Sequence, residues 1–416
     1  MSTAQPLVAP RLSIVVLTFA NLSNDPDQQY FADAVTEDLT TDLSRLSHMF
    51  VISRNSAFTY KDKPVNAKQI GRDLGVHYVL EGSIRRLGNQ IRVNAQLIDA
   101  ETDVHLWAER FDRDSGDLLA LQNEITGRIA NALNLKLIGV EAARPTDNLG
   151  ALEYIFRARA ALLKPVSSDN LAEAIGFYEH ALALDPRSVE AQSRLANALV
   201  GKVLNEMTDS ATSDITRAEE LIAQALAASP DSAAAHFAKG VLLRFWGRPD
   251  EAVLEFETVL AFDRNWVGAL FQLGWCKVMT GSFDEVIPLA EQAIRLSPRD
   301  PAIANFYWRI GWVHLLESHT GDAVLWLEKA RSANPRLAGL HAMLAAAYSL
   351  KGESERASAE LAEARRLSRD DRYSSIARLQ AAGYAGSRGY WGVPKVRALF
   401  EATYFAGLRN VGMPEE

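Results

Sequence analysis

The sequence contains one cysteine and no long apolar run, and both absences exclude classes of protein. Cys276 is the only cysteine among 416 residues, so one chain cannot form a disulfide or a metal site built on several thiolates. The longest N-terminal apolar run, residues 14–20, is far shorter than the ~20 residues of a membrane helix, and no signal peptide precedes it. We therefore expect a cytoplasmic protein with no membrane insertion, and a periplasmic one only if an upstream membrane helix is missing.

The chain also has no excess of basic over acidic residues. The chain has 44 Lys and Arg against 52 Asp and Glu, a net charge of −8, whereas nucleic-acid binders carry an excess of basic residues that neutralises phosphates. A phosphate-binding glycine loop of either the Walker or the dinucleotide type is missing as well. We predict no nucleic-acid partner, no cofactor, no bound metal and no catalytic residue, and the oligomeric state stays open.

The period of the apolar residues changes near residue 145. Before this point strand-like and helix-like segments alternate, and after residue 150 the pattern is helical almost throughout. The first part reads as strands and helices in the order β-α-β-α-β-β-β-α, at residues 12–19, 27–46, 49–53, 67–74, 77–86, 90–99, 103–111 and 117–137. We predict a small mixed-sheet α/β domain at residues 11–140, a linker at 141–150, an all-α region at 151–370 and a C-terminal capping segment at 371–416.

The all-α region repeats itself. Six similar segments begin at residues 181, 225, 259, 293, 330 and 364, with spacings of 44, 34, 34, 37 and 34 residues. Small residues recur where paired helices approach closely: Gly240, Gly274, Gly311 and Ala345 in first helices, and Ala174, Ala218, Ala252, Ala323 and Ala357 in second helices. A 34-residue unit of two helices is the period of the tetratricopeptide family, which this region resembles. The resemblance implies a solenoid of five to six repeats with a concave groove lined by first helices.

The first part carries a second resemblance. Its motifs are similar to the TolB-amino-terminal-like module, and they are Ser13–Ser23, Tyr30–Asp33, Thr36–Leu39, Gln69–Gly75, Tyr78–Ser83 and Leu106–Arg110. Bacterial proteins carry this module ahead of tetratricopeptide repeats, in class III adenylate-cyclase-related proteins and in CadC-type membrane regulators. The segment Arg397–Arg409 is similar to the end of the cyclase-related group. The chain starts where the module starts, so we expect it to lack the catalytic or DNA-binding domain of those relatives.

Aromatic and apolar residues form a stripe on three successive first helices, and these nine residues are the candidate site. They are Phe237, Val241, Phe245, Phe271, Trp275, Met279, Trp308, Trp312 and Leu315. By similarity to the family this face looks into the groove, where it would anchor a protein or peptide partner. The alternative is that the stripe is internal core, or that residues after Arg372 cover it, with Trp391, Val393, Val396, Leu399 and Phe400 as the lid.

Two other clusters are predicted to be structural. Asp25, Asp27, Asp33, Glu37, Asp38 and Asp42 surround the first long helix and are expected to form its capped, solvated face rather than a cation site. His314 and His319 are five residues apart, which on a continuous helix is about 500° of rotation, so they do not share a face as a metal-binding pair does.

These observations predict a non-enzymatic scaffold that binds a protein or peptide in its repeat groove. Two alternatives remain open. The chain could be the regulatory part of a split or truncated adenylate-cyclase-related signalling protein, or, with less support, a CadC-type transcription regulator without its DNA-binding domain.

Overall fold

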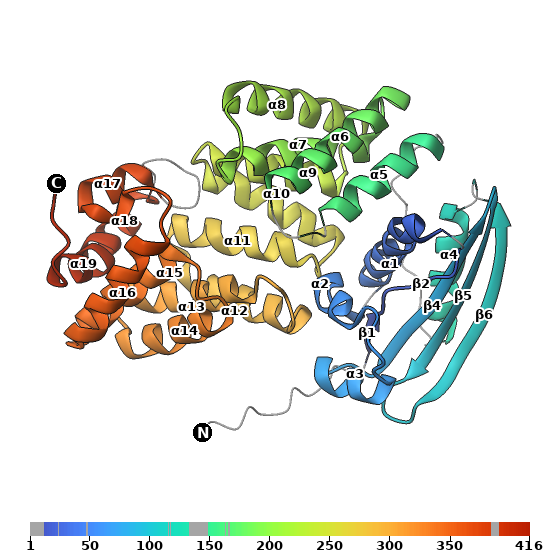
Figure 1. The fold of residues 1–416 in the computed structure, drawn as a ribbon, viewed down its shortest axis with the longest axis horizontal. Coiled ribbons are helices and arrows are strands. Elements are labelled where there is room, and N and C mark those ends of the chain that lie inside the picture. Colours follow the sequence, from blue (N-terminus) through green and yellow to red (C-terminus); the bar gives the residue numbers. More distant parts are fainter. Residues whose placement is uncertain are drawn as a thin grey trace. The chain divides into compact units, whose positions relative to one another are not determined.

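The computed structural model describes residues 12–23, 25–46, 49–114, 116, 118–132, 149–162, 164, 167–383 and 391–416. Two compact units emerge. The first comprises residues 1–238, 258–266 and 296–299, and the second comprises residues 239–257, 267–295 and 300–416. A small mixed sheet is followed by many helices, as the sequence predicts (Figure 1).

The sheet combines parallel and antiparallel strands in the order β3-β1-β4-β5-β6, with β2 pairing to β4. The strands are β1 (Ser13–Val16), β2 (Ala20–Asn21), β3 (Phe50–Val51), β4 (Tyr78–Leu87), β5 (Gln90–Asp99) and β6 (Val104–Asp114). β1 runs parallel to both β3 and β4, whereas β4, β5 and β6 form an antiparallel meander, as their short connections predict. The helices of this part are α1 (Gln29–Ser44), α2 (Arg54–Ala57), α3 (Ala67–Leu74) and α4 (Leu118–Ala132).

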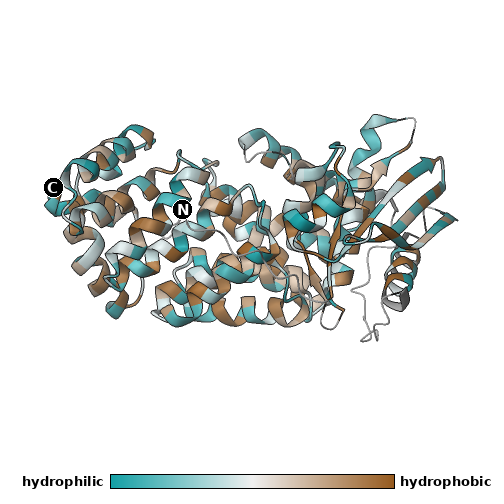
Figure 2. Cartoon of the chain, turned by 90° about the horizontal axis from the view of Figure 1, so that it is seen from below, coloured by the Kyte–Doolittle hydropathy of each residue, from teal (hydrophilic) through white to brown (hydrophobic). Residues whose placement is uncertain are grey.

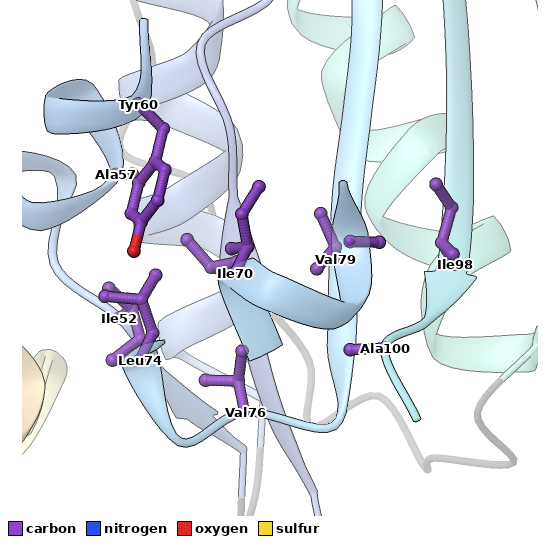
Figure 3. Packing of buried hydrophobic residues seen from close by; sticks show 11 residues of the cluster. Ile52, Ala57, Tyr60, Ile70, Leu74, Val76, Val79, Ile98 and Ala100 are labelled. Carbon is purple, nitrogen blue, oxygen red and sulfur yellow. The ribbon is translucent and has the colours of Figure 1, made fainter. Parts of the chain in front are cut away.

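A compact apolar cluster joins α3 to the sheet (Figure 3). Ile70 and Leu74 of α3 and Val79 and Ile98 of the sheet are each at most 4% exposed. The helix ends at Gly75, whose φ of +63° is the left-handed conformation that glycine adopts without strain. This boundary matches the predicted helix at residues 67–74.

The expectation of a solvated acidic face on α1 is wrong for four of its six residues. Asp25 and Asp27 are exposed, whereas Asp33 is only 7% exposed. Glu37, Asp38 and Asp42 are partly buried. The local sequence pattern did not reveal this burial, because the basic partners of Asp33, Glu37 and Asp38 come from segments outside α1. Those that pair with Glu37 are Arg54, Arg159 and Arg194, from α2, α5 and α7.

Six consecutive helix pairs follow within the described residues. They are α5 (Leu149–Ala161), α6 (Ser168–Leu184), α7 (Val189–Leu204), α8 (Ala211–Ala228), α9 (Ala233–Phe245), α10 (Pro249–Phe262), α11 (Val267–Thr280), α12 (Phe283–Leu296), α13 (Ile303–Leu316), α14 (Thr320–Ala333), α15 (Ala338–Leu350) and α16 (Ser354–Leu367). Brown apolar and teal polar residues alternate along them (Figure 2). Residues 141–148 of the predicted linker lie outside the described residues.

The predicted close approaches between paired helices hold at most positions. A Cβ added to Gly240 would lie 2.7 Å from the Phe256 ring, and one added to Gly311 would lie 2.7 Å from Leu327. The five alanines of the second helices are fully buried. The prediction is wrong at Gly274, where an added Cβ would meet nothing within 4 Å.

The chain ends in short helical segments that include α17 (Ile376–Ala382), α18 (Pro394–Phe400), a π-helical turn at Glu401–Phe405 and α19 (Ala406–Asn410). Residues 391–413 are called the C-terminal cover segment below. Within the second unit, α18 contacts α11, the π-helical turn contacts α13 and α15, and α19 contacts α15. Among the described helices, none has the length and apolar character needed to cross a membrane.

Candidate functional site on the first helices of the repeats

The stripe predicted from the sequence divides into two groups by exposure. Five members are buried, with at most 3% of the residue exposed, and these are Val241, Trp275, Met279, Trp312 and Leu315. The other four are partly exposed, and these are Phe237, Phe245, Phe271 and Trp308. The structure therefore places two of the three tryptophans of the stripe, Trp275 and Trp312, in the interior of the second unit.

The C-terminal cover segment lies over one end of the stripe. The ring centroids of Trp312 and Phe400 are 5.7 Å apart, and those of Phe400 and Trp391 are 4.9 Å apart in an edge-to-face arrangement. The Val393 N–H donates to the Met279 carbonyl oxygen at 3.0 Å. Aromatic pairs at these separations add to the free energy gained from burial. Two of the lid residues considered in the sequence, Val393 and Phe400, thus contact the stripe residues Met279 and Trp312.

The partly exposed members differ in how their rings are held. In the first unit Phe237 stacks on Trp266 with centroids 5.2 Å apart. In the second unit Trp308 donates from Nε1 to the Met343 sulfur at 3.1 Å. Phe245 packs edge-on, with ring centroids 5.0 Å apart, against a residue that the sequence analysis did not select.

That residue is Trp246, which is 51% exposed at the end of α9. It directly follows Phe245, the last stripe residue on α9, and this adjacency was the available signal. Large exposed aromatic side chains are enriched where proteins bind one another. Phe245, Trp246 and Phe271 are named the aromatic rim here.

Two arginines inside the stripe were also missed. Arg244 and Arg309 are each 7% exposed. The Arg244 guanidinium lies 5.0 Å from the Trp275 ring centroid, and that of Arg309 lies 4.7 Å from the centroid of Phe271. Such stacking is the cation–π geometry. An arginine flanked by apolar or aromatic residues, as in Leu243-Arg244-Phe245 and Trp308-Arg309-Ile310, was the signal that could have identified each one.

Cys276 follows Trp275 on α11 and is fully buried. Burial raises the pKa of its thiol to about 12, although the nearby Arg244 and Arg309 charges act in the opposite direction. A thiol with this pKa is not a nucleophile at neutral pH, so Cys276 acts as a buried apolar residue.

A hollow of about 990 Å³ lies in the α/β domain. The part of the sheet face beyond α3 carries polar side chains, including Glu81, Ser83, Asn94 and Gln96, and the loop at residues 60–65 borders it. Gln96 donates to Glu81, and Asn94 Nδ2 donates to Ser83 Oγ at 3.0 Å. These polar groups satisfy one another across the strands, and the sequence analysis did not single them out.

No family model matches the chain. Over 252 residues it is 39% identical to "Putative adenylate cyclase 3" of Rhizobium meliloti (strain 1021). The matched part is 59% of this chain and 43% of that protein, so the chain spans less than half the length of this curated relative.

Several solved structures resemble part of the chain at low sequence identity, and two of them, including YrrB, are described as tetratricopeptide repeat proteins. PilW, a type IV pilus biogenesis factor, is 20% identical, and the match covers 52% of this chain and 92% of PilW with a TM-score of 0.41. PilF of Pseudomonas aeruginosa is 18% identical, covering 52% and 91% with a TM-score of 0.40. YrrB, described as having an unusual peptide-binding site, is 24% identical, covering 44% and 87% with a TM-score of 0.31.

Proposed function

We propose that this chain is a non-enzymatic protein-interaction scaffold whose first-helix face binds a helical peptide segment bearing aromatic anchors. In this proposal the α/β domain is a TolB-like module, and the aromatic rim is the part of the face that a partner contacts first. The rim offers rigid rings that lose little conformational entropy on binding.

The observation that carries the proposal is the C-terminal cover segment itself. It is a helical segment with aromatic side chains, and it lies on the first helices α11, α13 and α15. Phe400 is fully buried, and the Trp391 indole donates from Nε1 to the Gln380 carbonyl at 3.0 Å. The face therefore already accommodates one segment of the chemistry that we propose for a partner, which fits the helix-in-groove mode of peptide recognition.

A peptide of residues 391–413, labelled with a fluorophore, tests this proposal. Phe400→Ala weakens the hold of the chain's own segment, so the peptide should bind this variant more tightly than the wild type. A peptide with alanine in place of Trp391 and Phe400 is the control and should bind neither. Equal binding of the two peptides would show that aromatic anchors do not determine recognition.

The rim is tested separately by replacing Trp246 and Phe271 with alanine. Proteins that co-purify with the wild-type chain should be lost from this variant. The matched control is Leu254→Ala, which removes a 64% exposed apolar side chain from the second helix α10. If both variants retain the same proteins, the rim is not the binding surface.

A second candidate function is the regulatory part of an adenylate-cyclase-related signalling protein. The 39% identity to "Putative adenylate cyclase 3" favours it over the CadC-type alternative. The purified chain should form no cyclic AMP from ATP with Mg²⁺ or Mn²⁺, and any formation would overturn the non-enzymatic proposal. Association with a separately expressed cyclase domain would favour the regulatory function.

A further inference from the structure

The turn between α13 and α14 brings together three side chains that can ligate a metal ion. They are His314, Glu317 and His319. The sequence argument separated the two histidines because it placed them on one continuous helix. In the structure α13 ends at Leu316 and α14 begins at Thr320, so His319 lies beyond the helix that carries His314.

The backbone of this turn folds His319 back over the end of α13. Ser318 has a φ of +63°, the left-handed region. The His319 N–H donates to the His314 carbonyl oxygen at 2.8 Å, and the Ser318 N–H donates to that of Leu315 at 3.0 Å. This pair of bonds is the Schellman motif, which reverses the chain at a helix C-terminus. The two imidazole rings consequently lie with their centroids 6.0 Å apart.

The three side chains converge closely enough for one ion. A ligand atom from each lies within 4.8 Å of the other two, and His319 Nδ1 is 3.6 Å from Glu317 Oε2. Ligands of a tetrahedral ion with bonds of about 2.1 Å are roughly 3.4 Å apart. Rotation of the His319 side chain, which is 60% exposed, and of the Glu317 side chain, which is 37% exposed, can close this difference.

The environment of His314 is an independent observation. Its side chain is partly buried, and its Nδ1 atom is buried without a hydrogen-bond partner among the described residues. Buried ring nitrogens are ordinarily bonded, because an unsatisfied one costs free energy. A nearby ion or the water that it carries would supply the missing interaction.

We propose that His314, Glu317 and His319 form a binding site for a divalent transition-metal ion of the Zn²⁺ class. Two imidazoles and one carboxylate suit Zn²⁺, Ni²⁺, Co²⁺ or Cu²⁺, whereas Mg²⁺ and Ca²⁺ prefer sites made of oxygen ligands alone. Water fills the remaining coordination positions. The ion would link the end of α13 to the start of α14, and so restrain the turn between the two helices of one repeat.

The proposal is tested with the full chain, freed of any histidine tag, by titrating Zn²⁺ against a chromogenic chelator. One equivalent should bind. His319→Ala and Glu317→Gln should each lower the affinity at least about tenfold, because removal of a group that only orients a ligand already costs that much. Both side chains are exposed, so these variants should fold, and circular dichroism verifies it. His105→Ala, at an exposed position on β6, is the control and should keep wild-type affinity.

Thermal unfolding gives a second readout. Zn²⁺ should raise the midpoint of the wild-type chain, since a ligand that binds only the folded state stabilises it. The same concentration of Mg²⁺ should leave the midpoint unchanged, and His314→Ala/His319→Ala should lose the Zn²⁺ response. The proposal is overturned if the wild type binds no Zn²⁺, or if this double variant binds it with wild-type affinity and stoichiometry.

Discussion

Arg159 of α5 donates from Nε to Glu37 Oε2 of α1 at 2.9 Å, across 122 residues of sequence. Its terminal nitrogen also donates to Asp38 Oδ1 at 2.8 Å. Burial acts to raise the pKa of the Glu37 carboxyl, but the charges of Arg159, Arg54 and Arg194 outweigh it and hold this pKa well below its usual range. The network joins the α/β domain to the first repeats within one compact unit.

Breaking this network should destabilise the first unit. Arg159 is 4% exposed, so Arg159→Met leaves two carboxylates without their principal partner and should cost about 3–5 kcal/mol of unfolding free energy. Arg157→Met removes an exposed pair with Glu153 and should cost about 1 kcal/mol or less. Urea unfolding measures both, and equal losses would mean that the buried network contributes no more than a surface pair.

Asp42 should make stability fall as the pH rises. Burial raises the pKa of its carboxyl to about 6, against the opposing charge of Arg45. Because this pKa is higher in the folded than in the unfolded chain, the folded state loses stability between about pH 4 and pH 6, as the carboxyl ionises. Asp42→Asn should therefore be more stable than the wild type at pH 8, by about 1–3 kcal/mol.

The gain from Asp42→Asn should shrink at pH 5, where the wild-type carboxyl is largely protonated. Urea unfolding at both pH values, on both proteins, measures this difference. A gain that is the same at pH 5 and pH 8 would show that the ionisation of Asp42 is not its cause.

His341 should have the opposite pH dependence. Its Nδ1 donates to Glu360 Oε2 at 2.5 Å and its Nε2 donates to the Pro335 carbonyl at 2.9 Å, so both nitrogens carry protons. The hydrogen bond to Glu360 raises the pKa of the imidazole. The resulting stability is present in full below the unfolded pKa, about 6.5, and is lost as the pH rises through the higher folded value.

Replacement by glutamine isolates this effect. Gln192 donates to Pro186 at the equivalent repeat position, so His341→Gln can keep the bond to the proline carbonyl. The variant should lose more stability, relative to the wild type, at pH 6 than at pH 9. His236→Gln, at the matching position beside Pro230, is the control. Its loss of stability should lack the pH-dependent part that Glu360 contributes at His341. If His341→Gln loses the same stability at pH 6 and pH 9, the charged imidazole is not the cause.

Two repeat glycines should respond oppositely to alanine. At Gly311 the new methyl group would lie 2.7 Å from Leu327, and overpacking of this kind costs about 1–3 kcal/mol. At Gly274 the methyl group meets nothing within 4 Å, so Gly274→Ala should stabilise the helix by about 0.4–1 kcal/mol. Thermal unfolding of both variants measures the difference, and destabilisation by Gly274→Ala would contradict the open space at that position.

Much of the fold could be predicted because its signals are local. The bounds of β5 and α3 agree with the predicted ones to the residue, since turn residues and helix caps act over a few positions. The stripe was located by helical periodicity, which identifies an apolar face. Periodicity does not say what covers that face, and Trp312 lies against Phe400, 88 positions further along the chain.

The sequence by itself determined the order of an α/β part and a repeat region, the repeat period and the small residues at most close contacts, because each depends on neighbours within one or two helices. Tertiary structure alone decided that Glu37 meets Arg159, that the C-terminal cover segment lies over Trp312, and that His319 turns back over His314. The first two depend on contacts between distant segments. The third depends on where α13 ends. The Schellman hydrogen bonds at Ser318 and His319 set this end, and a helical period in the sequence does not encode it.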